Sequence, residues 1–234
     1  MDERELKHFT MKVAIECNNV GVELLRSGCY RDAIATFRTA TLLMQSAFKV
    51  TNQNGLAGNA NLEVSMPSVA LLKKAKEKLH LVGTLTISSY EMSHFDTSYY
   101  VSDPILMESA TLSEDCSKCA QSAVMVFNMA LACHLIGTAS YLRKALSLYH
   151  TTLSIITQGG SKLNLCLRVT LPCLNNCGVI HHFLGHYEES RRFLNALSRE
   201  LISLAPCAEG ILPEYDLFYL NTALLTEPSI AAAA

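Results

Sequence analysis

The sequence predicts an all-α chain built from stacked helix pairs, and three observations lead to that prediction. Half of the 234 residues are apolar, so the chain can bury a sizeable core. Glycine and proline are scarce, at 11 and 6 residues, which favours long helices over linker-rich architectures. The third observation is an internal repeat, in which paired asparagines, a small residue and a later glycine recur along the chain.

The repeat is clearest when the start of the chain is compared with its last third. The run NNVGV at 18–22 is followed by Gly28, and the run NNCGV at 175–179 is followed by Gly185. In both copies, the later glycine comes seven residues after the glycine within the run. Each copy then continues into a second amphipathic segment. This order predicts a helix, a glycine turn and a second helix, because glycine suits the left-handed residue that ends a helix.

A third and weaker copy lies between these two. The run NMAL at 128–131 places Ala130 where the other copies have glycine, and Gly137 follows seven residues later. This copy needs three extra residues, 138–140, in its turn to keep the register of its second segment. The small residue within each first segment allows the second helix to approach closely. Helix pairs of this kind bury their apolar faces by stacking on their neighbours.

The spacing of these residues resembles the tetratricopeptide repeat family. The first unit matches the family pattern throughout, at Val20, Gly21, Leu24, Gly28, Tyr30, Ala33, Phe37 and Ala40. The third unit matches in its first helix and turn, and departs with Ser190, Leu194 and Leu197 in its second helix. The paired asparagines are most similar to the longer repeats of the kinesin light chain type. The resemblance covers about half of the chain and implies a helix-turn-helix solenoid with a concave groove.

The repeat register divides the chain into four regions. These are a first unit at 1–50, an insertion at 51–121, the second and third units at 122–205, and a tail at 206–234 with a capping helix. Within the insertion, residues 51–68 are rich in Asn, Gly and Ser and predict a loop. Residues 69–82 predict a short basic helix, and residues 84–106 predict an extended strand or irregular cover.

The cysteines and histidines give no pattern that predicts a metal, a cofactor or a redox site. Cys116 and Cys119 have the spacing of half a zinc site, but no second pair lies nearby and no βαβ pattern surrounds them. His182 and His186 lack the glutamate of a zinc-protease motif. The first residues, MDERELKHF, contain no apolar leader run, so we expect reduced thiols and a cytoplasmic chain, with the nucleus as the alternative.

Composition also argues against several other function classes. With 19 Lys+Arg against 21 Asp+Glu, the chain has no basic field for nucleic acid. The uncharged stretches 119–142 and 169–187 are long enough to span a bilayer, which takes about 20 residues, but each carries several amide or imidazole side chains. We therefore expect no membrane span. No phosphate loop, serine elbow, kinase or Rossmann motif occurs, so we expect no catalysis, with an enzyme of unfamiliar site as a weaker alternative.

The resemblance to tetratricopeptide repeats implies that the first helices line the groove. The side chains that it places there are Asn18, Val22, Arg26, Phe127, Leu131, His134, Asn175, Val179 and His182. Amides among apolar side chains suit an extended peptide, so we expect a protein–protein interaction module whose partner is another protein or peptide. The basic carboxylate clamp of chaperone-binding members is absent. The alternative is a structural subunit that self-associates through the apolar groove.

The roles of the asparagines follow less directly from the sequence. For Asn18 and Asn175, contact with a ligand and a bond to a neighbouring repeat's backbone are equally compatible with the pattern. For Asn19, Asn128 and Asn176, the bond to a neighbouring repeat is favoured. Groove residues are expected to face solvent in the free protein. Replacing them would then change partner binding and leave folding stability almost unaffected.

Overall fold

The computed structural model describes residues 3–52, 73, 77, 100–107, 116–159, 163–204 and 215–226. Every regular element within these residues is a helix, which confirms the predicted all-α class. The helices are α1 (Glu3–Arg26), α2 (Tyr30–Asn52), α4 (Cys116–Ile136), α5 (Ala139–Gly159), α6 (Leu163–Phe183), α7 (Tyr187–Leu204) and α8 (Tyr215–Thr226).

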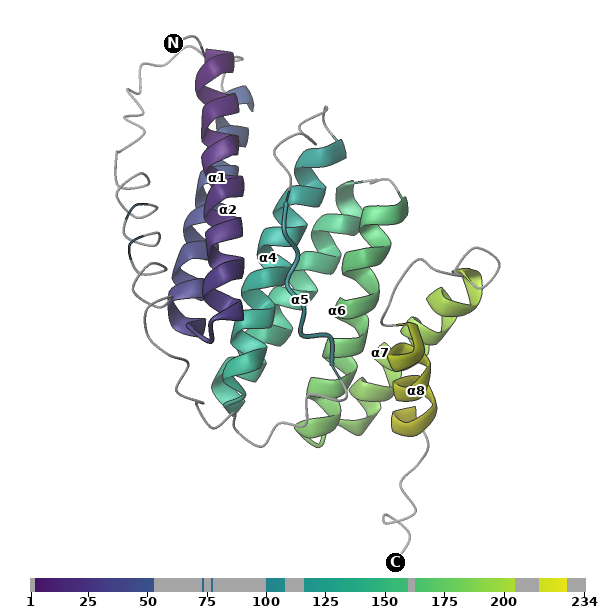
Figure 1. Cartoon of the computed structure of the whole chain (residues 1–234). Coiled ribbons are helices and arrows are strands. Elements are labelled where there is room, and N and C mark those ends of the chain that lie inside the picture. Colours follow the sequence, from purple (N-terminus) through teal and green to yellow (C-terminus); the bar gives the residue numbers. More distant parts are fainter. Residues whose placement is uncertain are drawn as a thin grey trace, which may run out of the picture.

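Helices that follow each other in the sequence pack against each other in space. The three pairs are α1 with α2, α4 with α5, and α6 with α7, and α8 packs on α7. Contacts from α2 to α4 and from α5 to α6 join one pair to the next. Figure 1 shows the resulting row, from purple α1 to yellow α8, with the teal segment at 100–107 crossing its face.

The turns within the pairs are closed by the predicted glycines. Gly28, Gly137 and Gly185 have φ angles of 75°, 73° and 76°, the left-handed region that favours glycine at the end of a helix. At the first turn, the Gly28 N–H donates to the Leu25 carbonyl at 3.0 Å and the Cys29 N–H donates to the Leu24 carbonyl at 2.8 Å. This pair of hydrogen bonds is the Schellman motif.

The second pair corrects one detail of the prediction. The extra residues 138–140 do not all enlarge the turn, because α5 begins at Ala139. Ala139 and Ser140 instead add to the first turn of the helix. The helix keeps its register from there, and Leu142, Ala145 and Tyr149 are all fully buried.

Two small residues let the paired helices approach closely. A Cβ atom added at Gly21 would lie 2.6 Å from the Phe37 ring of α2, and one added at Gly178 would lie 2.7 Å from the Leu194 side chain of α7. The departure from the repeat pattern at Ser190 also has a physical reason. Its buried hydroxyl donates to the Gly178 carbonyl at 2.8 Å, which adds a bond across the same seam.

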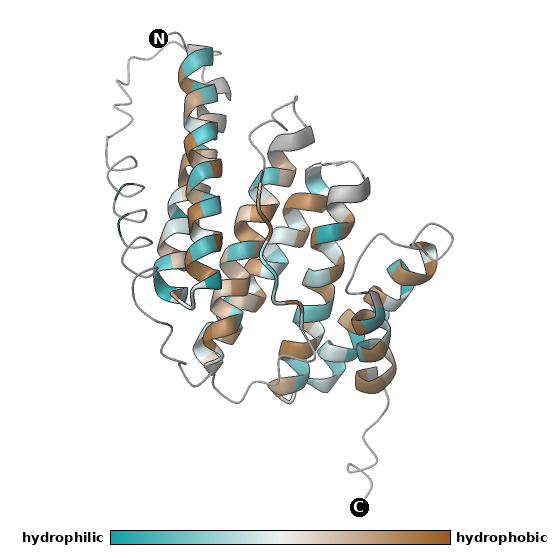
Figure 2. Cartoon of the chain, in the orientation of Figure 1, coloured by the Kyte–Doolittle hydropathy of each residue, from teal (hydrophilic) through white to brown (hydrophobic). Residues whose placement is uncertain are grey.

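Apolar residues gather between the helices, where they form the buried core, and Figure 2 shows hydrophobic and hydrophilic residues alternating along α1. Among the described residues, the stretch Cys119–Ile136 in α4 is long and apolar enough to cross a membrane, and 72% of it is buried inside the structure. Such burial is typical of the core helix of a helical bundle.

The limits of the insertion differ from the prediction. The helix α2 continues to Asn52 and α4 begins at Cys116, so both helices extend into the range 51–121. The predicted loop at 51–68 begins within α2 at its first two residues; the rest of it and the predicted basic helix at 69–82 lie outside the described residues, apart from Lys73 and Glu77. Residues 100–107 form neither helix nor strand, and they cross the helices α1, α4 and α6. In the tail, α8 is the expected terminal helix and packs on α7.

Candidate peptide-binding groove

The 100–107 segment crosses the first helix of each pair, and an asparagine on each helix holds it. On α6, the Val101 N–H donates to Asn176 Oδ1 at 2.9 Å. The Asn176 Nδ2 donates back to the Val101 carbonyl at 3.0 Å. Both backbone polar groups of one residue are thus satisfied by one side-chain amide, and both residues are buried.

The same arrangement occurs on the other two helices. On α4, Asn128 binds the Ile105 N–H at 2.9 Å and its carbonyl at 2.8 Å. On α1, Asn19 binds the Met107 N–H at 3.0 Å and its carbonyl at 2.8 Å. We refer to Asn19, Asn128 and Asn176 as the clamp asparagines. The segment therefore runs from α6 over α4 to α1, opposite to the order of the units in the chain.

The register of these bonds is that of an extended chain. In such a chain, the N–H and C=O of one residue point to the same side, and those of its neighbour point to the other side. The bound residues carry the numbers 101, 105 and 107, so they share one edge of the segment. The clamp asparagines therefore act on that edge as a neighbouring strand would.

Two further asparagines orient the clamps on α1 and α6. Asn18 donates to Asn19 Oδ1 at 3.2 Å, and Asn175 donates to Asn176 Oδ1 at the same distance. Asn18 also donates to the Ile105 carbonyl at 3.3 Å. We refer to Asn18 and Asn175 as the support asparagines. Asn175 is held in turn by the Asn221 amide of α8, which donates to it at 2.7 Å.

An aromatic site adjoins the α6 clamp. The Tyr100 ring lies over the His134 ring of α4, with centroids 4.3 Å apart. Tyr149 of α5 joins this site to the clamp, because its hydroxyl accepts from Asn176 at 3.0 Å and lies 3.4 Å from His134 Nδ1. Burial lowers the pKa of His134 to about 3 and raises the pKa of Tyr100 to about 12. Both rings are therefore neutral at physiological pH.

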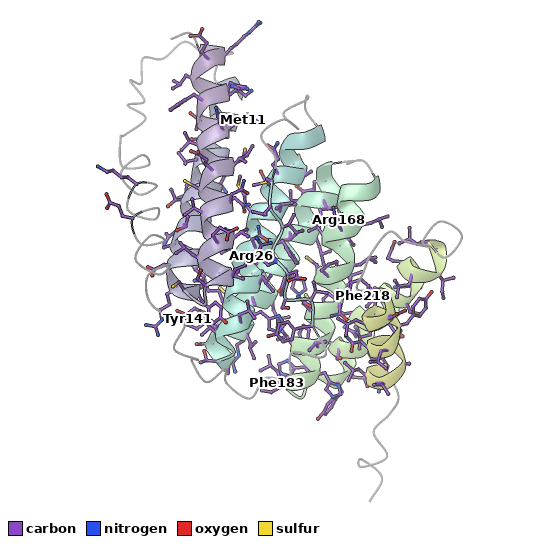
Figure 3. All side chains as sticks on the ribbon, viewed as in Figure 1. Met11, Arg26, Tyr141, Arg168, Phe183 and Phe218 are labelled. Carbon is purple, nitrogen blue, oxygen red and sulfur yellow. The ribbon has the colours of Figure 1, made fainter. Side chains whose placement is uncertain are left out.

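Part of the segment is exposed and its fit against the helices is incomplete. Ser102 and Asp103 are exposed and Leu106 is 48% exposed, whereas Pro104 is buried. A cavity of about 260 Å³ remains beside the segment. Figure 3 labels two of its basic residues, Arg26 on α1 and Arg168 on α6, which lie on either side of the segment in this view. The cavity is also lined by Val101, Asp103, Pro104, Ile105, Leu106, Phe127 and Pro172.

The structure brings some of the nine predicted groove residues to the segment and not others. Asn18 and His134 contact it directly, and Arg26 and Phe127 line the cavity beside it. Asn175 supports a clamp from behind. The remaining residues lie elsewhere: Val22, Leu131 and Val179 are buried, and the His182 ring lies 5.2 Å from the Tyr187 ring.

The expectation that groove asparagines face solvent in the free protein is wrong. Asn18 and Asn175 are fully buried, since the 100–107 segment and α8 cover them. Their replacement is therefore expected to affect folding stability as well as any binding.

For the clamp asparagines, the favoured bond to backbone within the chain occurs, but its partner is the 100–107 segment and not a neighbouring repeat. A signal for them was present: each lies two residues before the small residue of its unit, which is Gly21, Ala130 or Gly178. The support position, by contrast, is asparagine in two units and Phe127 in the other. Tyr100 had no such signal, because it belongs to no repeat.

The described residues offer no alternative site for a metal. None of them form a group of three or more His, Cys, Asp or Glu side chains that could hold an ion. Cys119 is a free thiol of intermediate exposure on α4. The rings of His181 and His186 lie 5.7 Å apart, and His181 stacks on Phe193 of α7.

Comparison of the chain with protein-family models, with curated proteins and with solved structures gives no match. Function is therefore inferred from the groove and the segment that lies in it.

Proposed function

We propose that this chain is a protein–protein interaction module, a tetratricopeptide-like solenoid whose concave groove binds a peptide in extended conformation. One observation carries the proposal: each clamp asparagine binds both the N–H and the C=O of one residue of the 100–107 segment. No side chain of the segment takes part in these bonds. The three amides therefore suit the backbone of any extended chain that enters in the same register.

The burial of the clamps supports this proposal. Asn128 and Asn176 are fully buried beneath the segment. A buried amide left without partners costs about 1–3 kcal/mol for each unsatisfied group. The clamp amides are therefore stable only when water or a peptide backbone supplies their hydrogen-bond partners. This chemistry is the one that recognition of extended peptides requires, because main-chain bonds supply affinity and side-chain sites supply specificity.

The helix pairs support the solenoid part of the proposal. Three turns closed by left-handed glycines, two seams built on Gly21 and Gly178, and contacts between successive pairs are all features that the tetratricopeptide resemblance implies. In the family, the first helices line the groove. Here the first helices are α1, α4 and α6, and they carry the clamps.

The alternative, self-association through the apolar groove, is supported less well. It requires a second copy of the chain to lie on the groove floor. That surface is polar at the three clamps, which suits a peptide backbone better than an apolar contact. A stable dimer of the wild-type chain in light scattering would favour the alternative.

A trans-binding experiment tests the proposed function. Residues 100–107 are replaced in the full chain by a Gly/Ser sequence of equal length, which gives the segment-replaced chain. The probe is the fluorescein-labelled octapeptide YVSDPILM, the sequence of residues 100–107. We expect binding by fluorescence anisotropy. The matched control is the same peptide N-methylated at the isoleucine equivalent to Ile105, which cannot donate to Asn128.

The control peptide is expected to bind about three- to tenfold more weakly, the equivalent of one lost hydrogen bond of roughly 0.5–1.5 kcal/mol. Absence of binding, or equal binding of the two peptides, would contradict the proposed function.

A further inference from the structure

Resting on the proposed function, we propose that the 100–107 segment is a built-in competitor for the groove. It is an intramolecular ligand that a partner must displace, and the partner's segment enters with an aromatic side chain on His134. The chain would thus regulate its own binding site.

The contacts that hold the 100–107 segment on the helices could also be made by a segment of another protein. Its described contacts with the helices are hydrogen bonds along one edge and the burial of a few side chains, among them Tyr100, Val101 and Met107. Ser102 and Asp103 are exposed and Leu106 is half-exposed, whereas Pro104 between them is buried. The cavity of about 260 Å³ shows that this segment does not fill the groove. A partner segment that filled the cavity would make contacts that residues 100–107 do not.

The aromatic site gives the first element of specificity. Tyr100 is only 4% exposed and lies against His134. Tyr149 contacts both His134 and Asn176, so the aromatic site and the α6 clamp form one hydrogen-bonded unit. This unit recognises two consecutive residues, an aromatic residue and then the apolar residue at the position of Val101.

The clamps define the direction and register of the partner. Its N-terminal end must lie over α6 and its C-terminal end over α1. The clamped residues follow the aromatic residue by one, five and seven positions, as Val101, Ile105 and Met107 follow Tyr100. Side chains at the positions of Val101 and Met107 are buried, whereas the position of Ser102 tolerates variation because it is exposed and does not line the cavity.

Competition within one chain has a measurable size. The apparent dissociation constant of a competing peptide rises in proportion as the open fraction of the groove falls. A segment that occupies the groove in about 99 of 100 molecules therefore weakens a competitor about 100-fold. Tethering favours such occupancy, since a linked segment has an effective concentration of roughly millimolar.

The test compares four forms of the full chain against the labelled octapeptide. These are the wild type, the segment-replaced chain, Tyr100→Ala, and Ser102→Ala as the control at an exposed residue of the segment that does not line the cavity. We expect the segment-replaced chain to bind about 100-fold more tightly than the wild type, and Tyr100→Ala about tenfold more tightly. Ser102→Ala should bind like the wild type. A probe with alanine in place of its tyrosine should bind the segment-replaced chain about tenfold more weakly.

The outcomes separate this inference from the proposed function. Equal probe binding by the wild type, Tyr100→Ala and the segment-replaced chain would overturn the inference and leave peptide binding intact. No binding to a folded segment-replaced chain would overturn the proposed function itself. Equal binding of the tyrosine and alanine probes would contradict the claim that the aromatic site contributes to specificity. If circular dichroism shows loss of helix in both Tyr100→Ala and the segment-replaced chain, the segment is an integral part of the fold and the inference is wrong.

Discussion

The clamps on α1 and α6 differ from the clamp on α4 in how they are supported. On α1 and α6, the residue before the clamp is a support asparagine of the same helix, which donates to the clamp's Oδ1. On α4, that position holds Phe127. The Asn128 amide of α4 instead donates to Oδ1 of Asn18 on the neighbouring helix α1, at 3.0 Å.

This difference shows which part of the motif the groove requires. The clamp asparagine occurs in all three units, whereas its support can come from the same helix or from a neighbour. Asn128 also joins the first helix pair to the second, because its amide binds both Ile105 and Asn18. We refer to this role of Asn128 as the joint. The predictions below test whether the three clamps are unequal in the way that this comparison implies.

The largest effect is expected for Asn128→Ala. This change removes two bonds to Ile105 and one to Asn18, and it leaves buried polar groups without a partner. We expect a loss of about 2–4 kcal/mol in the free energy of unfolding, measured by urea titration. Ser102→Ala, at an exposed residue of the segment, should change it by less than about 0.5 kcal/mol. A loss at Asn128 as small as at Ser102 would refute its role as the joint.

The next largest effect concerns the seam behind the α6 clamp. A side chain at Gly178 would overlap Leu194, since an added Cβ lies only 2.7 Å away. Gly178→Leu should therefore lower the free energy of unfolding by about 1–3 kcal/mol through overpacking. Ala35→Leu, on an exposed face of α2, is the matched control and should be within about 0.5 kcal/mol of wild type. Similar melting temperatures for both variants would contradict the close approach of α6 and α7.

A smaller effect should appear in the pH dependence of stability. The pKa of His134 is lowered from 6.5 to about 3 by burial, so between these values the unfolded chain binds a proton there and the folded chain does not. The free energy of unfolding should therefore fall as the pH falls below 6.5, by about 1 kcal/mol at pH 5.5 from this residue. His134→Phe keeps a ring against Tyr100 and should remove that part of the slope. The pKa of His181 is also lowered, but His181 is present in both proteins and contributes equally to both slopes. An unaltered slope in His134→Phe would therefore contradict the burial of His134 as a neutral ring.

The smallest effect is expected for Asn19→Ala. Asn19 is the clamp of intermediate exposure, so water can replace its two bonds to Met107. We expect a loss of about 0.5–1 kcal/mol in the same urea titration. A loss equal to that of Asn128→Ala would show that the three clamps are equivalent and would remove the distinction drawn above.

The sequence predicted the helix pairs better than it predicted the groove. Turns and seams depend on local spacing, so Gly28 and Gly178 could be assigned to them from the repeat alone. The occupant of the groove depends on bonds between residues far apart in the chain, such as Asn19 and Met107. Those bonds use the backbone of the segment, and a backbone group leaves no side-chain signal. From the sequence, irregular cover is therefore one of two open alternatives for residues 84–106, of which the structure describes 100–106.

The assignment of the asparagines could have been improved from the sequence. Asn18 and Asn175 attracted attention because they occupy a ligand-contacting position in the family that the chain resembles. The comparison of all three units points instead to the position of Asn128, where asparagine occurs each time. A polar residue that recurs at one register position of every unit is a stronger indication of shared chemistry than its position in a distant family.

Amide hydrogen exchange of the 100–107 segment tests the central claim most directly. NMR on the wild-type chain should show protected N–H groups at Val101, Ile105 and Met107, because each donates to a clamp asparagine. Asn176→Ala should reduce protection mainly at Val101, and Asn19→Ala mainly at Met107. Exchange of all three amides at the rate of an unstructured chain in the wild type, or equal effects of the two variants on every amide, would contradict the claim that three asparagines hold an extended segment in the groove.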